Sequence, residues 1–145
     1  IIAEKEFVLK LIEVEKSRLK TLKDFIPQTD FFFELPNYEA NLLRLKDETL
    51  PEIETSLLKS LRAVEKINAK EFTAKSIKEA LESIVDSTSR GQIYWPLRVA
   101  LSGKKASPDP AEIGSIIGKE ETEKRIKIAL EKVTNTRENY YDQSS

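Results

Sequence analysis

The segment GQIYWPLRVALSG, residues 91–103, predicts a helix over residues 92–102 that ends at a glycine, a residue typical of the position after a helix. Trp95, the only tryptophan, stands beside Pro96 and three positions before Arg98. In one interpretation Trp95 fills the core and Pro96 begins or bends the helix. In the other, the indole ring and the guanidinium are presented to a flat, charged partner. The residues on either side of this segment help to distinguish these two interpretations.

The composition around this segment indicates an all-α protein. The 145 residues include only 4 glycines, and 34% of them are charged. Lys, Glu and Leu are abundant, and these residues favour helices. Hydrophobic residues make up 39% of the chain, which is enough to bury one ordinary core. We therefore expect one domain or two small helical subdomains.

Cysteine and histidine are both absent. Without cysteine the chain has no disulfide framework, thiolate metal site or cysteine nucleophile. Without histidine it also lacks the commonest general base, the Ser-His-Asp triad and the commonest metal ligand. A carboxylate-based enzyme would need two facing acids, and no spacing indicates such a pair. We therefore expect neither a catalytic residue nor a metal site.

Apolar residues at helical spacing and capping residues predict helices on both sides of the segment. Thr49 begins a capping box with Pro51 in the first turn. Asn68 begins another capping pattern, and Thr73 is a second candidate N-cap. Asp109 can cap a helix whose first residue is Pro110. The expected helices span about residues 3–24, 50–67, 73–86, 92–102, 110–118 and 120–133.

The predicted architecture is a bundle of about seven helices without a strand. Residues 1–67 would form an N-terminal subdomain, residues 68–135 a C-terminal subdomain and residues 136–145 a polar tail. The phenylalanines at 31–33 are expected in the core. The chain opens with Ile-Ile, so we expect a fragment of a longer protein or a processed chain. No apolar run approaches the ~20 residues of a membrane span, no signal peptide is recognisable, and a cytoplasmic location is expected.

Positive charge is concentrated around the quoted segment, although the net charge of the chain is only −1. No acidic residue occurs between Asp86 and Asp109. A local excess of one sign favours a partner of the opposite sign. The basic residues of this interval are Arg90, Arg98, Lys104 and Lys105.

A helix that carries an arginine, a basic Ser-Pro loop, a capped short helix and a glycine follow one another over residues 96–126. Their order matches the signature G-Q-x-x-x-P-L-R-x-A-L-[ST]-G, then [ST]-P, then L-G-K-E, preceded near the N-terminus by R-x-x-T-L-x-[DE]-F. Through these motifs nearly the whole chain resembles the C-terminal anticodon-binding region of bacterial-type glutamyl-tRNA synthetases, which are class I aminoacyl-tRNA synthetases. The matching residues are 18–25, 91–92, 96–98, 100–103, 107–108 and 117–120.

The resemblance implies a helical cage in two subdomains that docks on the anticodon loop of glutamate tRNA. Such a chain performs no chemistry itself. ATP and magnesium would be used by a separate catalytic domain of the same polypeptide, whose ATP-binding signatures are absent from this sequence. We therefore expect no cofactor in this chain. The expected partners are glutamate tRNA and the catalytic domain, with no membrane, and the expected state is a monomer.

The resemblance and the basic interval together supply candidate contacts with RNA. Bases of single-stranded loops are recognised by stacking on aromatic rings or arginine planes and by hydrogen bonds to their edges. Lysines beside such a site contact phosphates, a role expected for Lys104 and Lys105. The candidate anticodon-binding residues are Arg18, Gln92, Trp95, Arg98, Ser107, Pro108 and Pro110.

In the family, an arginine at the position of Arg18 is associated with reading the last anticodon base, a cytosine, which separates glutamate tRNA from glutamine tRNA. A surface salt bridge with Glu13 or Glu15 is the structural alternative, and discriminating and non-discriminating specificity both stay open. Asp109 and Trp95 depart from the residues common in the family. The alternative function is a helical protein–protein adapter without RNA binding, which suits the near-neutral charge and the amphipathic helices.

Overall fold

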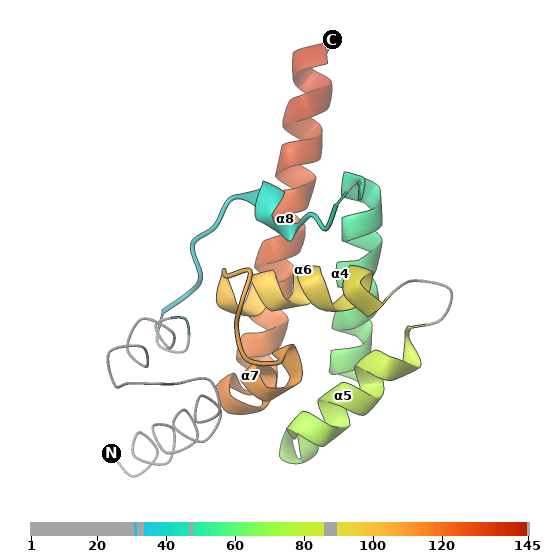
Figure 1. Ribbon diagram of the computed structural model, residues 1–145, viewed down its shortest axis with the longest axis vertical. Coiled ribbons are helices and arrows are strands. Elements are labelled where there is room, and N and C mark those ends of the chain that lie inside the picture. The colour runs from blue at the N-terminus through green and yellow to red at the C-terminus, as the bar shows by residue number, and fades with distance from the viewer. Residues whose placement is uncertain (1–30, 32–33, 47, 86–89, 145) are drawn as a thin grey trace.

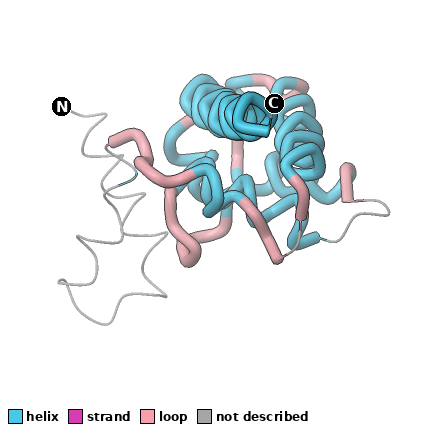
Figure 2. The backbone as a smooth tube through the Cα atoms, turned by 90° about the horizontal axis from the view of Figure 1, so that it is seen from above, coloured by secondary structure: helices cyan, strands magenta, loops and turns pink. Residues whose placement is uncertain are grey.

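The computed structural model describes residues 31, 34–46, 48–85 and 90–144, with side chains up to Thr136. The regular structure in this part of the chain is helical, without a strand (Figures 1 and 2), which confirms the all-α class. None of its helices has both the length and the apolar character that crossing a bilayer requires. In chain order the elements are η1 (Ala40–Leu43), α4 (Leu50–Glu65), η2 (Ala69–Glu71), α5 (Ala74–Ser83), α6 (Arg90–Ser102), α7 (Pro110–Ile117) and α8 (Lys119–Ser144).

The described residues contain five α-helices and two short 3₁₀-helices, so the expected number of about seven helices is too high for this part of the chain. The expected helix over residues 3–24 lies outside the described residues, as do Arg18 and residues 32–33. The capping pattern that begins at Asn68 produces only the single turn η2 before the next helix. The division into two subdomains at residue 67 stays a prediction.

Local hydrogen bonds explain where the helices begin. Thr49 Oγ1 accepts the backbone N–H of Glu52 at 3.3 Å, which confirms the predicted start of α4. The Glu52 carboxylate accepts the Thr49 hydroxyl at 3.1 Å, so the reciprocal half of the predicted capping box is not formed. At α5 the box is complete, because Thr73 and Ser76 each accept the other's backbone N–H, at 3.1 and 3.0 Å. Such caps satisfy N–H groups that have no partner inside the helix.

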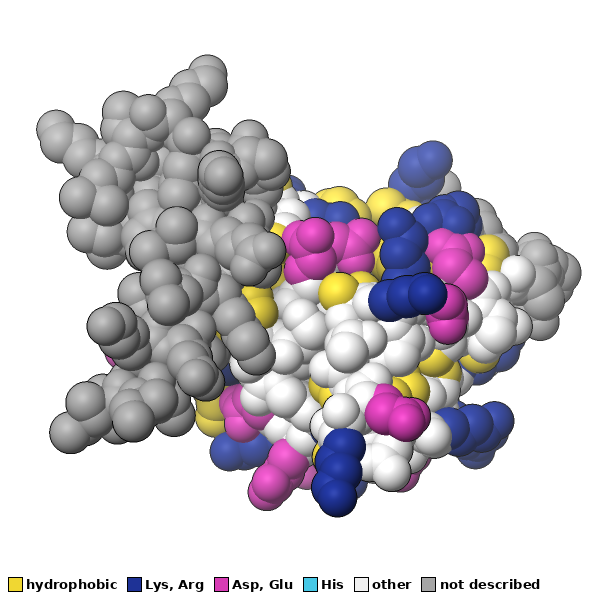
Figure 3. Space-filling model, turned by 90° about the horizontal axis from the view of Figure 1, so that it is seen from below, with side chains coloured by type: hydrophobic (Ala, Val, Ile, Leu, Met, Phe, Trp, Pro, Cys, Tyr) yellow, Lys and Arg dark blue, Asp and Glu magenta, His cyan; other side chains and the backbone are white. Residues whose placement is uncertain are grey.

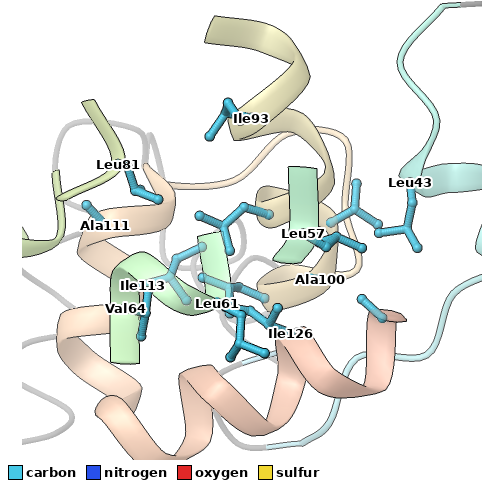
Figure 4. Packing of buried hydrophobic residues seen from close by; sticks show 14 of the residues in the cluster. Leu43, Leu57, Leu61, Val64, Leu81, Ile93, Ala100, Ala111, Ile113 and Ile126 are labelled. Atoms are coloured by element: carbon cyan, nitrogen blue, oxygen red, sulfur yellow. The ribbon is translucent and has the colours of Figure 1, made fainter. Parts of the chain in front are cut away.

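Helix α6 packs against both α4 and α8, and these three helices surround the centre of the core (Figures 1 and 4). Figure 4 shows Leu57 of α4 and Ala100 of α6 within this packed cluster. Full burial of one such leucine stabilises the fold by roughly 1.5–3 kcal/mol. Phe31 is buried, as predicted, and belongs to the same cluster. The inward face of α4 includes the buried residues Ile53, Leu57, Leu61 and Val64.

Pro96 lies inside α6 rather than at its start. The helix begins at Arg90, two residues before the expected position. Of the two roles expected of Pro96, beginning the helix or bending it, the structure therefore excludes the first. A proline has no N–H, and the carbonyl of Gln92, four residues earlier, therefore loses its usual helical donor. Pro96 is itself buried, and its ring contributes to the packed side of α6.

The last helix is longer than the apolar pattern predicts. The apolar stripe of Ile126, Ala129 and Val133 is fully buried, but α8 continues to Ser144. The predicted end near Val133 is therefore wrong for the backbone. The apolar stripe marks where packing ends, whereas a helix ends where a breaker or a cap occurs. No glycine or proline follows Gly118, so nothing in the composition stops the helix.

Candidate nucleic-acid interface

The loop that joins α6 to α7 is fixed by polar atoms at the end of α6. Ser102 Oγ donates to the carbonyl of Arg98 at 2.7 Å and accepts the backbone N–H of Lys104 at 3.1 Å. Gly103 has a φ of +71°, and a Cβ placed on it would lie 2.9 Å from the Cβ of Pro36. Any other residue would combine backbone strain with a steric clash. The loop therefore lies directly against the Pro36 segment.

Arg98 closes this loop from within α6. Its Nη1 donates to the carbonyl oxygen of Ser107 at 2.7 Å, and the side chain is half-buried. A guanidinium has five N–H donors. The other donors of Arg98 have no partner among the described residues. The arginine thus holds the loop in place with one hydrogen bond and keeps capacity for a second acceptor.

The Ser-Pro segment is buried rather than displayed. Ser107, Pro108 and Pro110 are all buried, and Ser107 Oγ donates to the Pro108 carbonyl at 2.9 Å. Asp109 caps α7, because its Oδ1 accepts the backbone N–H of Ala111 at 2.9 Å, and this confirms the predicted cap. These residues shape the loop, and the accessible polar groups come from their neighbours.

Trp95 is oriented by a hydrogen bond across the fold. Its Nε1 donates to the carbonyl of Leu42 at 3.0 Å, between residues 53 positions apart in the sequence. The side chain is half-buried and packs on the core, while part of it lines an open groove. The indole therefore fills a gap, as the first interpretation expects, and part of it also remains accessible; its presentation to a partner stays a prediction.

The groove beside Trp95 has a volume of about 570 Å³. We name it the η1 groove, because η1 and the residues on either side of it form one wall, while α6 and the following loop form the other. Sequence reasoning identified Trp95 and Lys105 but missed the opposite wall. No spacing in the sequence relates the two walls, since only packing brings them together. The residues that line it include Asn37, Asn41, Arg44, Lys46, Trp95 and Lys105.

Gln92 lies apart from this groove. It lines a separate hollow of about 290 Å³ with Glu48, Glu52 and Lys59. Both carboxylate oxygens of Glu48 are buried, and neither has a hydrogen-bond partner among the described residues. Burial raises the pKa of Glu48 above its usual value, and the charge of the nearby Glu52 raises it further. The structure therefore does not bring Gln92 together with the other predicted contacts.

The two predicted phosphate-contacting lysines differ in environment. Lys104 is half-buried, with its Nζ 5.4 Å from the centroid of the Phe31 ring. Lys105 is exposed and lines the η1 groove. Basic and acidic side chains are interspersed on the face shown in Figure 3, as expected for a chain with a net charge of −1. Any surface of one sign must therefore be local.

Arg90, the remaining arginine of the basic interval, is already paired. Its guanidinium forms an ion pair with Glu82 and lies 5.2 Å from the centroid of the Tyr94 ring. The Tyr94 hydroxyl donates to Glu82 Oε1 at 2.9 Å. This hydrogen bond and the arginine lower the pKa of Glu82, while burial and the carboxylate raise the pKa of Tyr94 to about 12. The cluster joins α5 to α6 and neutralises Arg90.

Comparison with known proteins identifies relatives of this helical unit. Residues 2–130 match the family model described as "Anticodon binding domain". The glutamate–tRNA ligase of Clostridium tetani (strain Massachusetts / E88) is 37% identical over 134 residues, which cover 88% of this chain and 27% of the relative. That of Fusobacterium nucleatum subsp. nucleatum is 32% identical over 148 residues, which cover 90% and 29%. The chain thus spans little more than a quarter of these relatives' length.

Two solved structures resemble the chain in fold. A glutamate tRNA ligase from Elizabethkingia meningosepticum CCUG26117, in complex with its amino acid, superposes with a TM-score of 0.74 and 30% identity, over 87% of this chain and 25% of that one. The glutamate-tRNA synthetase of Elizabethkingia anophelis superposes with a TM-score of 0.66 and 30% identity, over 87% and 24%.

Proposed function

Because the chain belongs to the anticodon binding domain family, we propose that it is the segment of a glutamate–tRNA ligase that binds the anticodon loop of glutamate tRNA. The observation that carries this proposal is the family match over residues 2–130. Similarity to glutamate–tRNA ligases supports the assignment to glutamate tRNA. The chain spans 27% of the Clostridium tetani enzyme.

In this proposal the chain positions the RNA and does not catalyse a reaction. Activation of glutamate with ATP and magnesium, and its transfer to the tRNA, belong to a separate catalytic domain of the same polypeptide. Binding energy from the anticodon contributes to catalysis by holding the distant 3′ end of the tRNA in a productive position. The protein is proposed to act in the cytoplasm, where translation takes place.

The proposed recognition surface consists of α6 and the loop that follows it. Arg98 would donate its unused N–H groups to a base edge or a phosphate, since guanidinium groups bind both. Trp95 would provide a stacking surface one helical turn away. Lys104 and Lys105 would add salt-sensitive attraction to phosphates. Ser107 would act through its carbonyl, which already fixes Arg98.

Arg18 and Gln92 are the two other predicted contacts. Arg18 lies outside the described residues, and its role in reading the last anticodon base is proposed from the family resemblance. Gln92 lines the hollow with Glu48, so it would contact the RNA only if the bound strand passes over the start of α6.

The test is a salt titration of the chain with the anticodon stem-loop of glutamate tRNA, beside a copy whose last anticodon base is changed from C to G. The proposal predicts binding that weakens as salt rises, because released counterions drive such association. A preference for C supports a discriminating enzyme and a role for Arg18. Equal binding of both copies supports a non-discriminating one. Absence of salt-dependent binding contradicts the proposal and favours the helical adapter.

A further inference from the structure

We propose that the η1 groove is a second RNA-contact region, in which Arg44, Lys46 and Lys105 hold backbone phosphates while a base stacks on Trp95. This inference rests on the proposed function and extends it to a surface that the sequence motifs do not include. The groove continues the proposed recognition surface, since Trp95 and Lys105 belong to both. A strand that leaves the loop along α6 would therefore cross it.

The charge of the groove is uncompensated within the described part of the chain. Arg44, Lys46 and Lys105 form no ion pair or side-chain hydrogen bond with described residues, and all three are exposed. Glu39 is the acidic residue among those that line the groove. A concave surface lined by one sign of charge focuses the field and attracts a ligand of the opposite sign.

Three buried or half-buried cations of the described chain are used differently. Lys119 Nζ donates to the carbonyl of Glu65 at 2.9 Å, Lys132 Nζ donates to that of Tyr38 at 3.0 Å, and Arg125 bonds to Leu101. Those side chains hold elements of the fold together. The cations of the η1 groove have no such structural task, so an external anion is the partner that their positions fit.

The remaining walls of the groove favour a nucleotide over a simple anion. The Leu42 carbonyl holds the indole of Trp95 in a fixed orientation, and a fixed flat ring stacks on any base. Asn37 and Asn41, both exposed, offer amide donors and acceptors to base edges or to a ribose hydroxyl. A volume of about 570 Å³ lies in the range of sites that enclose a small ligand.

The backbone at Lys46 gives further support. Its φ is +56°, in the left-handed region that residues with a side chain adopt at a cost. Such conformations cluster at sites that bind ligands. Beside Lys46, the N–H of Glu48 donates to the carbonyl of Leu45 at 3.2 Å.

The experiment compares two double variants that remove the same charges. Arg44→Gln/Lys46→Gln changes the groove, and Arg62→Gln/Lys66→Gln changes the opposite end of α4, where both residues are also exposed. Each variant is titrated with the anticodon stem-loop of glutamate tRNA over a series of salt concentrations. The slope of log K against log salt is negative, and the groove variant is expected to reduce its magnitude by about 1.4, since each lost contact to single-stranded RNA removes roughly 0.7.

The control variant should keep the wild-type slope, and both variants should keep the wild-type preference for the last anticodon base. Equal slopes for all three proteins overturn the groove inference and leave the proposed function standing. Failure of the wild-type chain to bind the stem-loop at low salt overturns both. Circular dichroism of each variant establishes that it is folded.

A second readout separates RNA from an acidic protein segment. Trp95 is the only tryptophan, so its fluorescence reports on the groove directly. Stacking of a base should quench this fluorescence, and the groove variant should need several-fold more RNA for the same quenching. Poly-glutamate of the same charge should bind weakly and leave the fluorescence unchanged. Binding of poly-glutamate as tight as that of the RNA overturns the assignment to RNA.

Discussion

A pair of substitutions at Arg98 can separate its observed contact with the loop from its proposed contact with RNA. It fixes the loop through its hydrogen bond to Ser107, and we propose that it also contacts the anticodon. Arg98→Ala removes both functions and should weaken binding of the anticodon stem-loop by ~1–3 kcal/mol. Arg98→Lys keeps a donor for the loop but loses the planar fork of the guanidinium, so its affinity should fall between those of Arg98→Ala and the wild type.

The measurement is the dissociation constant of each variant at fixed salt, together with its melting temperature. A loss of affinity in Arg98→Ala with an unchanged melting temperature assigns the effect to RNA contact. If Arg98→Ala melts earlier and binds normally once folded, the arginine is a structural residue of the loop. Unchanged affinity in a stable Arg98→Ala protein removes it from the recognition surface.

Glu48 predicts a pH dependence of stability. It is only 6% exposed, its carboxylate has no hydrogen-bond partner in the described part of the chain, and burial raises its pKa. The folded state therefore binds the proton more tightly than the unfolded chain does. The stability that this contributes is complete below the usual glutamate pKa of about 4.3 and is lost as the pH rises through the folded-state pKa. Glu48→Gln should therefore stabilise the protein at neutral and alkaline pH.

The expected gain for Glu48→Gln is about 1 kcal/mol near pH 8, and it should shrink as the pH is lowered towards about 4.5. Denaturant unfolding at several pH values measures it. Glu79→Gln removes an equal charge from an exposed position of α5 and should change stability by less than about 0.5 kcal/mol. A gain for Glu48→Gln that does not vary with pH would refute the explanation by burial of a charge.

At the scale of elements, the end of α6 depends on a buried arginine in α8. Arg125 is 3% exposed, donates to the Leu101 carbonyl at 2.7 Å and pairs with Glu121 at 3.0 Å. The last carbonyls of a helix have no partner inside it, and a cation there also suits the helix dipole. Arg125→Met keeps the aliphatic bulk but leaves the Leu101 carbonyl unsatisfied, so it should destabilise the fold by about 1–3 kcal/mol.

Thermal or urea unfolding of Arg125→Met tests this, beside Lys124→Met, which makes the same kind of change at an exposed neighbour. The control should unfold within about 0.5 kcal/mol of the wild type. Equal stability of both variants would mean that water satisfies the Leu101 carbonyl and that the hydrogen bond from Arg125 contributes nothing to stability.

The elements themselves were predictable where their signals are local. A cap lies within four residues of the groups that it satisfies, so Thr73 and Asp109 indicated helix starts correctly. The extension of α8 was missed, because the end of an apolar stripe does not end a helix. The burial of Arg125 was missed as well, since its partner Leu101 belongs to another helix.

At the scale of the whole molecule, the candidate site also combines residues that the sequence indicated with residues that it did not. Trp95, Arg98 and Lys105 were found from one basic interval of the sequence. Arg44 and Lys46 were not, because the fold alone brings their segment to Trp95, across the 53 positions that separate Trp95 from Leu42. Sequence motifs thus indicated one wall of the η1 groove, and only the packing of η1 on α6 revealed the other.

The core extends across the predicted subdomain boundary at residue 67. Ile53 and Leu57 precede the boundary, Leu97 and Ile126 follow it, and all four belong to one continuous buried cluster. Segments that share a core unfold together, since neither can keep its apolar surface buried alone. We therefore expect a single cooperative thermal transition. Circular dichroism reports on all the helices and Trp95 fluorescence on the contact between α6 and η1, so the two melting curves should coincide. Curves that separate by several degrees would mean that residues 1–67 and 68–135 are independent units, and the η1 groove, which draws one wall from each, would then open before the helices melt.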